Sequence, residues 1–364
     1  MMTDRERFLE TMRFGTPDRI PYWEFGVFAQ ALERWRQEGL PADVSLDEYF
    51  GLDKRVPIAV NFQMWPEFEQ KILAETDEFE IVIERFGIKQ RRWKDSRIGM
   101  PEFIEHPIRT RADFQEMKRR YDPDSPQRYP QPWDVYVKQC KERDYPLHAQ
   151  AFRHIGFFGP IRNWMGLEAL LFAFYDEPLW VHEMMEFIGD FLVAMAERIG
   201  PHITLDYLVF FEDIGYKGST LISPQIFRTF MMPHYRRVTD AFRKYGTDIL
   251  FADSDGWNDN LIPLWMSCGV NGFSPMEAAA GGKGPVALRK EYGRDLLLYG
   301  GMDKRVLAQD KGAVEKEVLS KLPYMVETGG YIPTIDHAIP HDASFENYVY
   351  YRQLIRNVAE GRNH

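Results

Sequence analysis

From residue 147 onward the chain repeats one unit, a short apolar run followed by a longer helical pattern such as 178–199 or 224–245. This alternation predicts a parallel sheet with helices outside it. Because no GxGxxG turn is present, we predict an α/β fold closed into a (β/α)8 barrel, or TIM barrel, in preference to a doubly wound sheet. The strands are expected at 147–152, 207–211, 248–252, 272–274, 296–299 and 330–334.

Two further elements are expected before the barrel repeats. Residues 3–12 read as a capped amphipathic helix, stopped by Gly15 and Pro17, and a short strand is expected to begin near Ile20. Residues 79–93 alternate around Phe86 and Gly87, which predicts a β-hairpin laid over the body of the domain.

The whole chain is expected to be a single domain, residues 1–364. Its 364 residues are within the range of one α/β barrel. Gly and Pro are scattered along the chain, and no low-complexity tract or run of five like charges suggests a linker.

Charge and cysteine content exclude several classes of partner. The net charge of −10 provides no basic surface for nucleic acid. Apolar stretches such as 169–175 are far shorter than the roughly 20 residues that span a bilayer, so no membrane association is expected. Only two cysteines, and a charged start without a signal-peptide core, predict a cytoplasmic protein without disulfides.

Active sites of α/β barrels lie at the carboxyl ends of the strands, so the residues after each predicted strand are the candidates. Carboxylates and imidazoles recur in five clusters after the predicted strands, residues 153–160, 210–219, 251–257, 274–282 and 334–342. Glu212 is a catalytic candidate, to which Asp213 adds negative charge, and Glu277 is a substrate-binding candidate. The alternative for each of these acidic residues is a helix cap or a solvated charge.

Asp253 and Asp255 stand two residues apart, so in a continuing strand they point the same way. Two neighbouring carboxylates raise one another's pKa or share a cation. The alternative is that Asp255 lies in a tight turn and Asp253 caps the next helix. His337 is the imidazole chosen for catalysis, because Asp336 or another carboxylate could fix its tautomer, the alternative being an ordinary loop histidine.

Aromatic residues near these clusters suit a planar substrate, although large rings more often fill a core. Trp23, Phe157, Phe158 and Trp257 are the substrate-binding candidates. Other rings considered are Phe25, Phe62, Trp65 and Phe211.

Several blocks resemble the uroporphyrinogen decarboxylase-like superfamily in order and spacing, over nearly the whole chain. They are residues 5–26, 156–185, 212–238, 300–308 (GGMDKRVLA) and 329–355. Porphyrinogen decarboxylases of that superfamily carry an Arg-rich block of the RQAGR type after the first strand. The chain has YWEFGVFAQALERW there, with Glu24 where guanidinium groups would be needed. Decarboxylation of a porphyrinogen is therefore disfavoured.

The resemblance is better to the corrinoid-dependent methyltransferases. Thiol-methylating members of that branch bind zinc through a His-x-Cys pair and a distant Cys. Those positions correspond to Asp253, Asp255 and His337 in this sequence, while Cys140 and Cys268 match neither and are expected to be buried. The resemblance thus implies either a harder oxygen and nitrogen site for a divalent metal such as zinc, or no metal.

The resemblance also implies methyl transfer with a corrinoid (cobalamin) carried on a separate corrinoid-binding protein. O-demethylation of a methoxylated aromatic compound is the first expectation, and methyl transfer to tetrahydrofolate is the alternative. A decarboxylase or lyase acting on another acid stays open, as does a homodimer. Cleaving an aryl methyl ether requires a proton or a cation at the leaving oxygen, which a carboxylic acid, His337 or a metal could supply.

Overall fold

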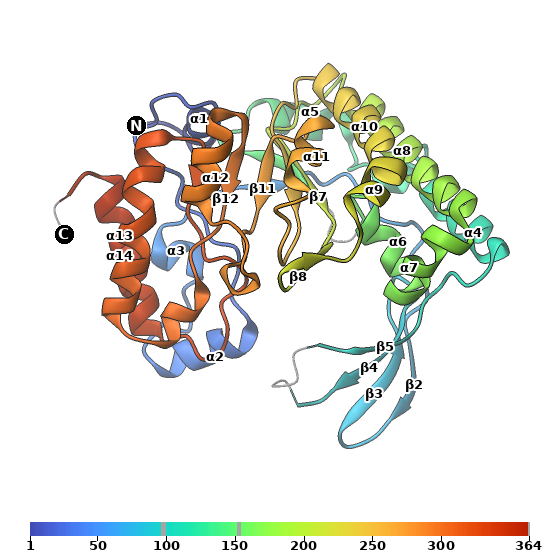
Figure 1. Ribbon diagram of the computed structural model, residues 1–364, viewed down its shortest axis with the longest axis horizontal. Coiled ribbons are helices and arrows are strands. Elements are labelled where there is room, and N and C mark those ends of the chain that lie inside the picture. Colours follow the sequence, from blue (N-terminus) through green and yellow to red (C-terminus); the bar gives the residue numbers. More distant parts are fainter. Residues whose placement is uncertain (96–99, 151–153, 363–364) are drawn as a thin grey trace.

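A parallel seven-stranded sheet forms the centre of the computed structural model, which describes residues 1–95, 100–150 and 154–362 (Figure 1). All neighbouring strands are parallel, and from β6 onward each pairs with the next strand of the sheet along the chain. The order is β1 (Val56–Pro57), β6 (Leu147–Ala149), β7 (Tyr207–Phe211), β10 (Leu250–Asp253), β11 (Gly272–Ser274), β12 (Leu297–Tyr299) and β13 (Tyr331–Ile332). The last two residues of the strand expected at 147–152 lie outside the described residues.

Side chains of one strand divide between two hydrophobic clusters, which shows how the sheet curls. In β7, Leu208 and Phe210 pack into the large cluster between the sheet and the helices. Tyr207 and Val209 pack into a smaller cluster with Phe8 and residues of β10, β12 and β13. Because successive side chains of a strand face opposite sides, the smaller cluster fills the concave face of the sheet.

Helices cover the convex face, where α8 packs against α10 and α13 against α14 (Figure 1). The longer helices are α8 (Pro178–Ile199), α10 (Met232–Lys244), α13 (Lys311–Thr328) and α14 (Phe345–Ala359). The others are α1 (Asp4–Met12), α2 (Ala29–Gln37), α3 (Leu46–Phe50), α4 (Arg111–Lys118), α5 (Trp133–Lys141), α6 (Phe158–Met165), α7 (Leu167–Asp176), α9 (Pro224–Ile226), α11 (Ile262–Ser267) and α12 (Pro285–Tyr292). No helix of the described residues is long and apolar enough to cross a membrane.

The strand expected to begin near Ile20 is not a strand in the described residues. Residues 20–25 instead contact both edges of the sheet through individual hydrogen bonds. The Asp53 amide, just before β1, donates to the Tyr22 carbonyl at 2.8 Å, and the Ile335 amide, after β13, donates to Glu24 Oε1 at 3.0 Å. The parallel α/β arrangement is confirmed, whereas the described ladder has seven strands and does not continue from β13 to β1.

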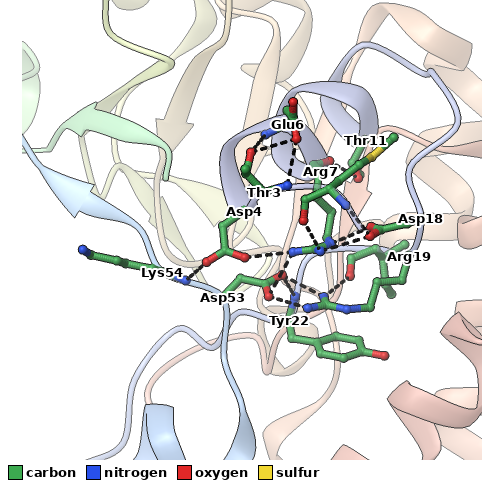
Figure 2. A network of polar contacts seen from close by, with 12 residues as sticks. Thr3, Asp4, Glu6, Arg7, Thr11, Asp18, Arg19, Tyr22, Asp53 and Lys54 are labelled. Carbon is green, nitrogen blue, oxygen red and sulfur yellow. Dashed lines mark hydrogen bonds and ion pairs between the residues drawn. The ribbon is translucent and has the colours of Figure 1, made fainter. Parts of the chain in front are cut away.

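A buried ion-pair network joins this segment to α1 and to the start of β1 (Figure 2). Arg7 Nε donates to Asp18 at 2.8 Å, and Arg7 Nη1 lies 3.3 Å from Asp53. Arg19 also pairs with Asp53, whose other contact is the Tyr22 amide at 2.9 Å. The Arg7 side chain is only 3% exposed, so each charge depends on its partners for solvation. The predicted N-terminal helix is confirmed, with Thr3 and Glu6 forming a capping box.

The predicted hairpin is part of a four-stranded antiparallel sheet that projects from the body of the molecule (Figure 1). β3 (Phe79–Ile83) pairs with β4 (Lys89–Trp93), flanked by β2 (Lys71–Glu75) and β5 (Glu102–Glu105). The hairpin is confirmed, but it does not lie flat over the body. A small ribbon of β8 (Gly215–Tyr216) and β9 (Ser219–Thr220) follows β7.

Candidate active site

A cavity of about 420 Å³ opens within the curl of the parallel sheet, a volume typical of small-molecule sites. Four of its lining residues are each the last residue of a strand: Phe211 of β7, Asp253 of β10, Ser274 of β11 and Tyr299 of β12. This is the end of the sheet where active sites of α/β barrels lie. The remaining lining residues are Trp23, Phe25, Phe28, Arg55, Met100, Gln150, Tyr207, Val209, Asp213, Phe251, Asp255 and His337.

Asp253 is a buried carboxyl group that faces this cavity. It is 5% exposed, and its one hydrogen-bonding neighbour among the described residues is Gln150, whose Nε2 lies 3.5 Å from Oδ2. Burial, together with the charges of Asp213 and Asp255, raises the pKa of Asp253 well above its ordinary value. The raised pKa favours the protonated form of Asp253, the form that can donate a proton.

Asp255 and His337 form a pair beside it. His337 Nε2 lies 3.2 Å from Asp255 Oδ2, and both side chains are partly exposed. The hydrogen bond that His337 donates to Asp255 raises the pKa of His337, against the opposing effect of burial. The imidazole also packs between Phe25 and Phe28, with ring centroids 5.7 and 5.9 Å away.

Asp253 and Asp255 both line the cavity, although β10 ends at Asp253, and His337 joins them. Ser254, between the two carboxylates, turns away and bonds to Asn258 and to the Ile214 amide.

Glu212 does not line the cavity, and its predicted catalytic role has no support in this position. Its carboxylate is fully buried and accepts hydrogen bonds from the amides of Phe157, Phe158 and Gly159 and from the Tyr235 hydroxyl. Phe211 and Asp213 line the cavity, whereas Glu212 points away from it. Burial raises the pKa of Glu212 to about 7, while these hydrogen bonds favour its charged form.

Trp23 is the one predicted substrate-binding residue that lines the cavity. The predicted substrate-binding role of Phe157 and Phe158 is wrong, because both side chains are fully buried in the core at the start of α6. Trp257 and Glu277 lie outside the lining, and Glu277 pairs with Lys304 at 2.7 Å.

Asp336 is not the partner of His337. Its buried carboxylate accepts hydrogen bonds from the Ala278 and Lys304 amides at 2.8 and 3.0 Å. The carboxylate that can fix the tautomer of His337 is Asp255, in agreement with the expectation that a carboxylate other than Asp336 could do so.

Two charged residues that were not among the predicted site residues also line the cavity. Asp213 has a positive φ of 49° and pairs with Arg162 at 3.3 Å. It lies beyond the end of β7, where strand alternation no longer predicts which side chains face the cavity. Arg55 comes immediately before β1, a two-residue strand with no apolar run by which the sequence could reveal it. The cluster beginning at Arg153 starts outside the described residues.

The profile of the family described as Uroporphyrinogen decarboxylase (URO-D) matches residues 3–358. The chain belongs to the URO-D family. Two curated uroporphyrinogen decarboxylases, from two strains of Thermus thermophilus, are each 25% identical over 206 residues. That match covers 55% of this chain and 54% of either relative, about half the length of each.

A solved structure described as a methyltransferase from Methanosarcina mazei has the same fold. It is 14% identical, with a TM-score of 0.64, over 98% of this chain and 99% of the other. At that identity the likeness concerns the fold alone, so within the URO-D family the chemistry must be argued from the cavity.

The cavity of this URO-D family member is lined by Asp213, Asp253, Asp255 and His337. In the described ranges, however, no three His, Cys, Asp or Glu side chains are grouped so that they could hold a metal ion. The expected ligands Asp253, Asp255 and His337 are therefore not arranged as a metal site in this structure. Cys140 and Cys268 are both buried and outside the cavity lining, as expected.

Proposed function

We propose that this chain is a methyltransferase that demethylates a methoxylated aromatic compound. The observation that carries the proposal is the position of Asp253, a buried carboxyl without a basic partner among the described residues, at the wall of an aromatic-lined cavity. Loss of a methyl group from an aryl ether leaves a phenolate, and a carboxylic acid next to that oxygen can protonate it as it departs.

The cavity suits one aromatic ring. Its walls include Trp23, Phe211 and Phe251, and Tyr299 stands edge-on to Trp23 with ring centroids 5.9 Å apart. Such walls bind a flat ring through offset and edge contacts. A substrate ring held there brings its methoxy group to the strand ends, where Asp253 and the Asp255–His337 pair lie.

A corrinoid held on a separate corrinoid-binding protein would supply the nucleophile that takes the methyl group. A cavity of about 420 Å³ suits a single-ring substrate and not a tetrapyrrole-sized ring system, so the corrinoid would approach at the mouth. Phe28 and Met100 line that mouth and are 45% and 65% exposed, an apolar rim that fits such an approach.

In the proposed reaction the bond between the methyl carbon and the aryl oxygen breaks, and both electrons stay on the oxygen. Asp253 donates its proton to that oxygen, giving the phenol and leaving the Asp253 carboxylate. His337, which is partly exposed and bonded to Asp255, would then return a proton from solvent to Asp253. The acidic charges of Asp213 and Asp255 favour this return, because they disfavour a charged Asp253.

Porphyrinogen decarboxylation, the reaction in the names of the Thermus relatives, is less well supported. A porphyrinogen carries acidic groups on four rings, whereas among the described lining residues Arg55 is the one Lys or Arg. Negative charge on Asp213 and Asp255 would repel such a substrate at the strand ends.

The test is methyl transfer from 4-methoxybenzoate to Co(I) cobalamin, followed by phenol release and by the absorbance of methylcobalamin. We expect turnover only when the corrinoid is present, and equal turnover in the Cys140→Ser, Cys268→Ser double variant. Conversion of the methoxy compound without corrinoid would contradict the proposal. Methylcobalamin consumption dependent on tetrahydrofolate, with no demethylation of any methoxy compound, would favour the tetrahydrofolate alternative.

A further inference from the structure

Arg55 brings a positive charge into the cavity from the amino end of β1. Its Nη1 donates to the Tyr299 hydroxyl at 3.0 Å and its Nη2 to the Glu24 carbonyl at 2.8 Å. The guanidinium also lies over the Trp23 ring, 4.7 Å from the centroid. No carboxylate of the described residues forms an ion pair with Arg55, whereas Arg7 and Arg143 both have carboxylate partners.

Other buried arginines without a carboxylate partner differ from Arg55 in how their donors are used. Arg128 makes four hydrogen bonds to backbone carbonyls, and Arg289 likewise directs its donors to four carbonyls. Arg55 has five N–H donors, as every guanidinium has, and the two hydrogen bonds above leave the rest available in a cavity.

Tyr207 provides a second donor at this end of the cavity. It is the first residue of β7, is 3% exposed, and stacks on His148 with ring centroids 4.6 Å apart. Its hydroxyl makes no hydrogen bond of ordinary geometry within the described part of the chain, and Arg55 is close enough to interact with it. Burial raises the pKa of Tyr207, so the hydroxyl keeps its proton and can donate it.

We propose that Arg55, positioned by its hydrogen bond to the Tyr299 hydroxyl and assisted by the hydroxyl of Tyr207, binds the carboxylate of an aromatic acid in this cavity. A planar guanidinium matches a carboxylate with two parallel hydrogen bonds, and a cation without a carboxylate partner gains from such a ligand. The acidic residues at the strand ends repel the ligand's carboxylate, so the ring substituent opposite it faces Asp253. That orientation rests on the proposed function, whereas carboxylate binding itself does not.

Calorimetric titration of three probes tests the site without a corrinoid. The probes are 4-methoxybenzoate, its methyl ester, and methoxybenzene. For the wild-type protein we expect a Kd at least tenfold lower for the acid than for either neutral probe. In Arg55→Gln the acid should lose this preference, and in Arg55→Lys part of it should remain. Tyr207→Phe should weaken acid binding severalfold and leave the ester unchanged.

Equal Kd values for acid and ester in the wild-type protein would overturn the proposal, as would no binding of the acid or an unchanged preference in Arg55→Gln. The wild-type comparison decides even if Arg55→Gln fails to fold. Acid binding that depends on Arg55 without any methyl transfer would leave this site in place and remove the proposed function. Methyl transfer with equal affinity for acid and ester would leave the proposed function in place and remove the carboxylate site.

Discussion

Two clusters of acidic residues in this molecule are neutralised in different ways. In the N-terminal network, Asp18 and Asp53 meet the guanidinium groups of Arg7 and Arg19 (Figure 2). At the strand ends, Asp253 has no basic partner among the described residues and has two further carboxylates beside it.

The consequences for protonation are opposite. The hydrogen bond from Arg7 lowers the pKa of Asp18 to about 2, which keeps that side chain charged. Burial raises the pKa of Asp253, which favours its neutral form. Paired charges hold the fold together, whereas an unpaired, buried carboxyl is a reactive acid. The predictions below separate these two roles.

Asp253→Asn should produce the largest effect. It removes the acid and preserves the shape of the side chain, so kcat should fall by about 10²–10⁴-fold with little change in KM. The free energy of unfolding should not fall at neutral pH, because no ion pair is broken and the variant avoids the cost of burying an ionisable carboxyl. Steady-state methyl transfer and urea unfolding measure the two quantities. Full activity in this variant would remove Asp253 from the mechanism.

Arg7→Met should instead lower the stability of the protein. It leaves Asp18 and Asp53 without one of their cationic partners, and the free energy of unfolding should fall by about 3–5 kcal/mol. Arg119→Met is the matched control, because Arg119 is 78% exposed in its pair with Glu116 and should cost at most about 1 kcal/mol. Equal losses in the two variants, by urea unfolding, would mean that the network contributes no special stability.

The two clusters should also respond oppositely to pH. Asp18 has a lowered folded-state pKa, so its stabilising contribution is present above its unfolded pKa and is lost as the pH falls toward 2. The folded-state pKa of Asp253 is raised, so its contribution is present below the unfolded pKa and is lost as the pH rises toward the folded value. Unfolding free energies measured across pH should show Asp18→Asn flattening the acid limb, and Asp253→Asn removing a fall in stability that begins just above the unfolded pKa of an aspartate. The Asp18 effect should be about 1 kcal/mol or somewhat more, and the Asp253 effect should be larger because Asp253 is more deeply buried. Identical profiles for both variants would contradict the comparison.

Glu212→Gln should have the smallest effect on turnover. The carboxylate caps the start of α6 and faces away from the cavity, so we expect a change in kcat of less than about threefold, with a stability loss of roughly 1–2 kcal/mol. A hundredfold loss of kcat at unchanged stability would return Glu212 to the catalytic residues.

The sequence could predict features that depend on periodicity. The parallel α/β arrangement and the hairpin at 79–93 follow from spacing alone. Features set by irregular backbone were not predictable in this way. Residues 20–25 join the sheet edges by single hydrogen bonds, and Asp213 has a left-handed φ, which no periodic pattern reveals.

The tertiary environment decided the remaining assignments. Glu212 and Asp213 are adjacent acidic residues, but only their burial and partners show that one caps a helix and the other lines the cavity. Arg55 was not predicted, because the feature that makes it a binding candidate is the lack of a carboxylate partner in the cavity. That feature is a property of the folded molecule.

The central claim is that Asp253 is protonated in the folded protein at neutral pH. Infrared difference spectroscopy of the wild-type protein against Asp253→Asn at pH 7 tests this without substrate or corrinoid, because the C=O stretch of a carboxylic acid is separate from the bands of a carboxylate. We predict a protonated-carboxyl band in the wild-type protein that is absent from Asp253→Asn. A difference spectrum showing only loss of carboxylate bands would mean that Asp253 is charged, and the proposed acid would be wrong.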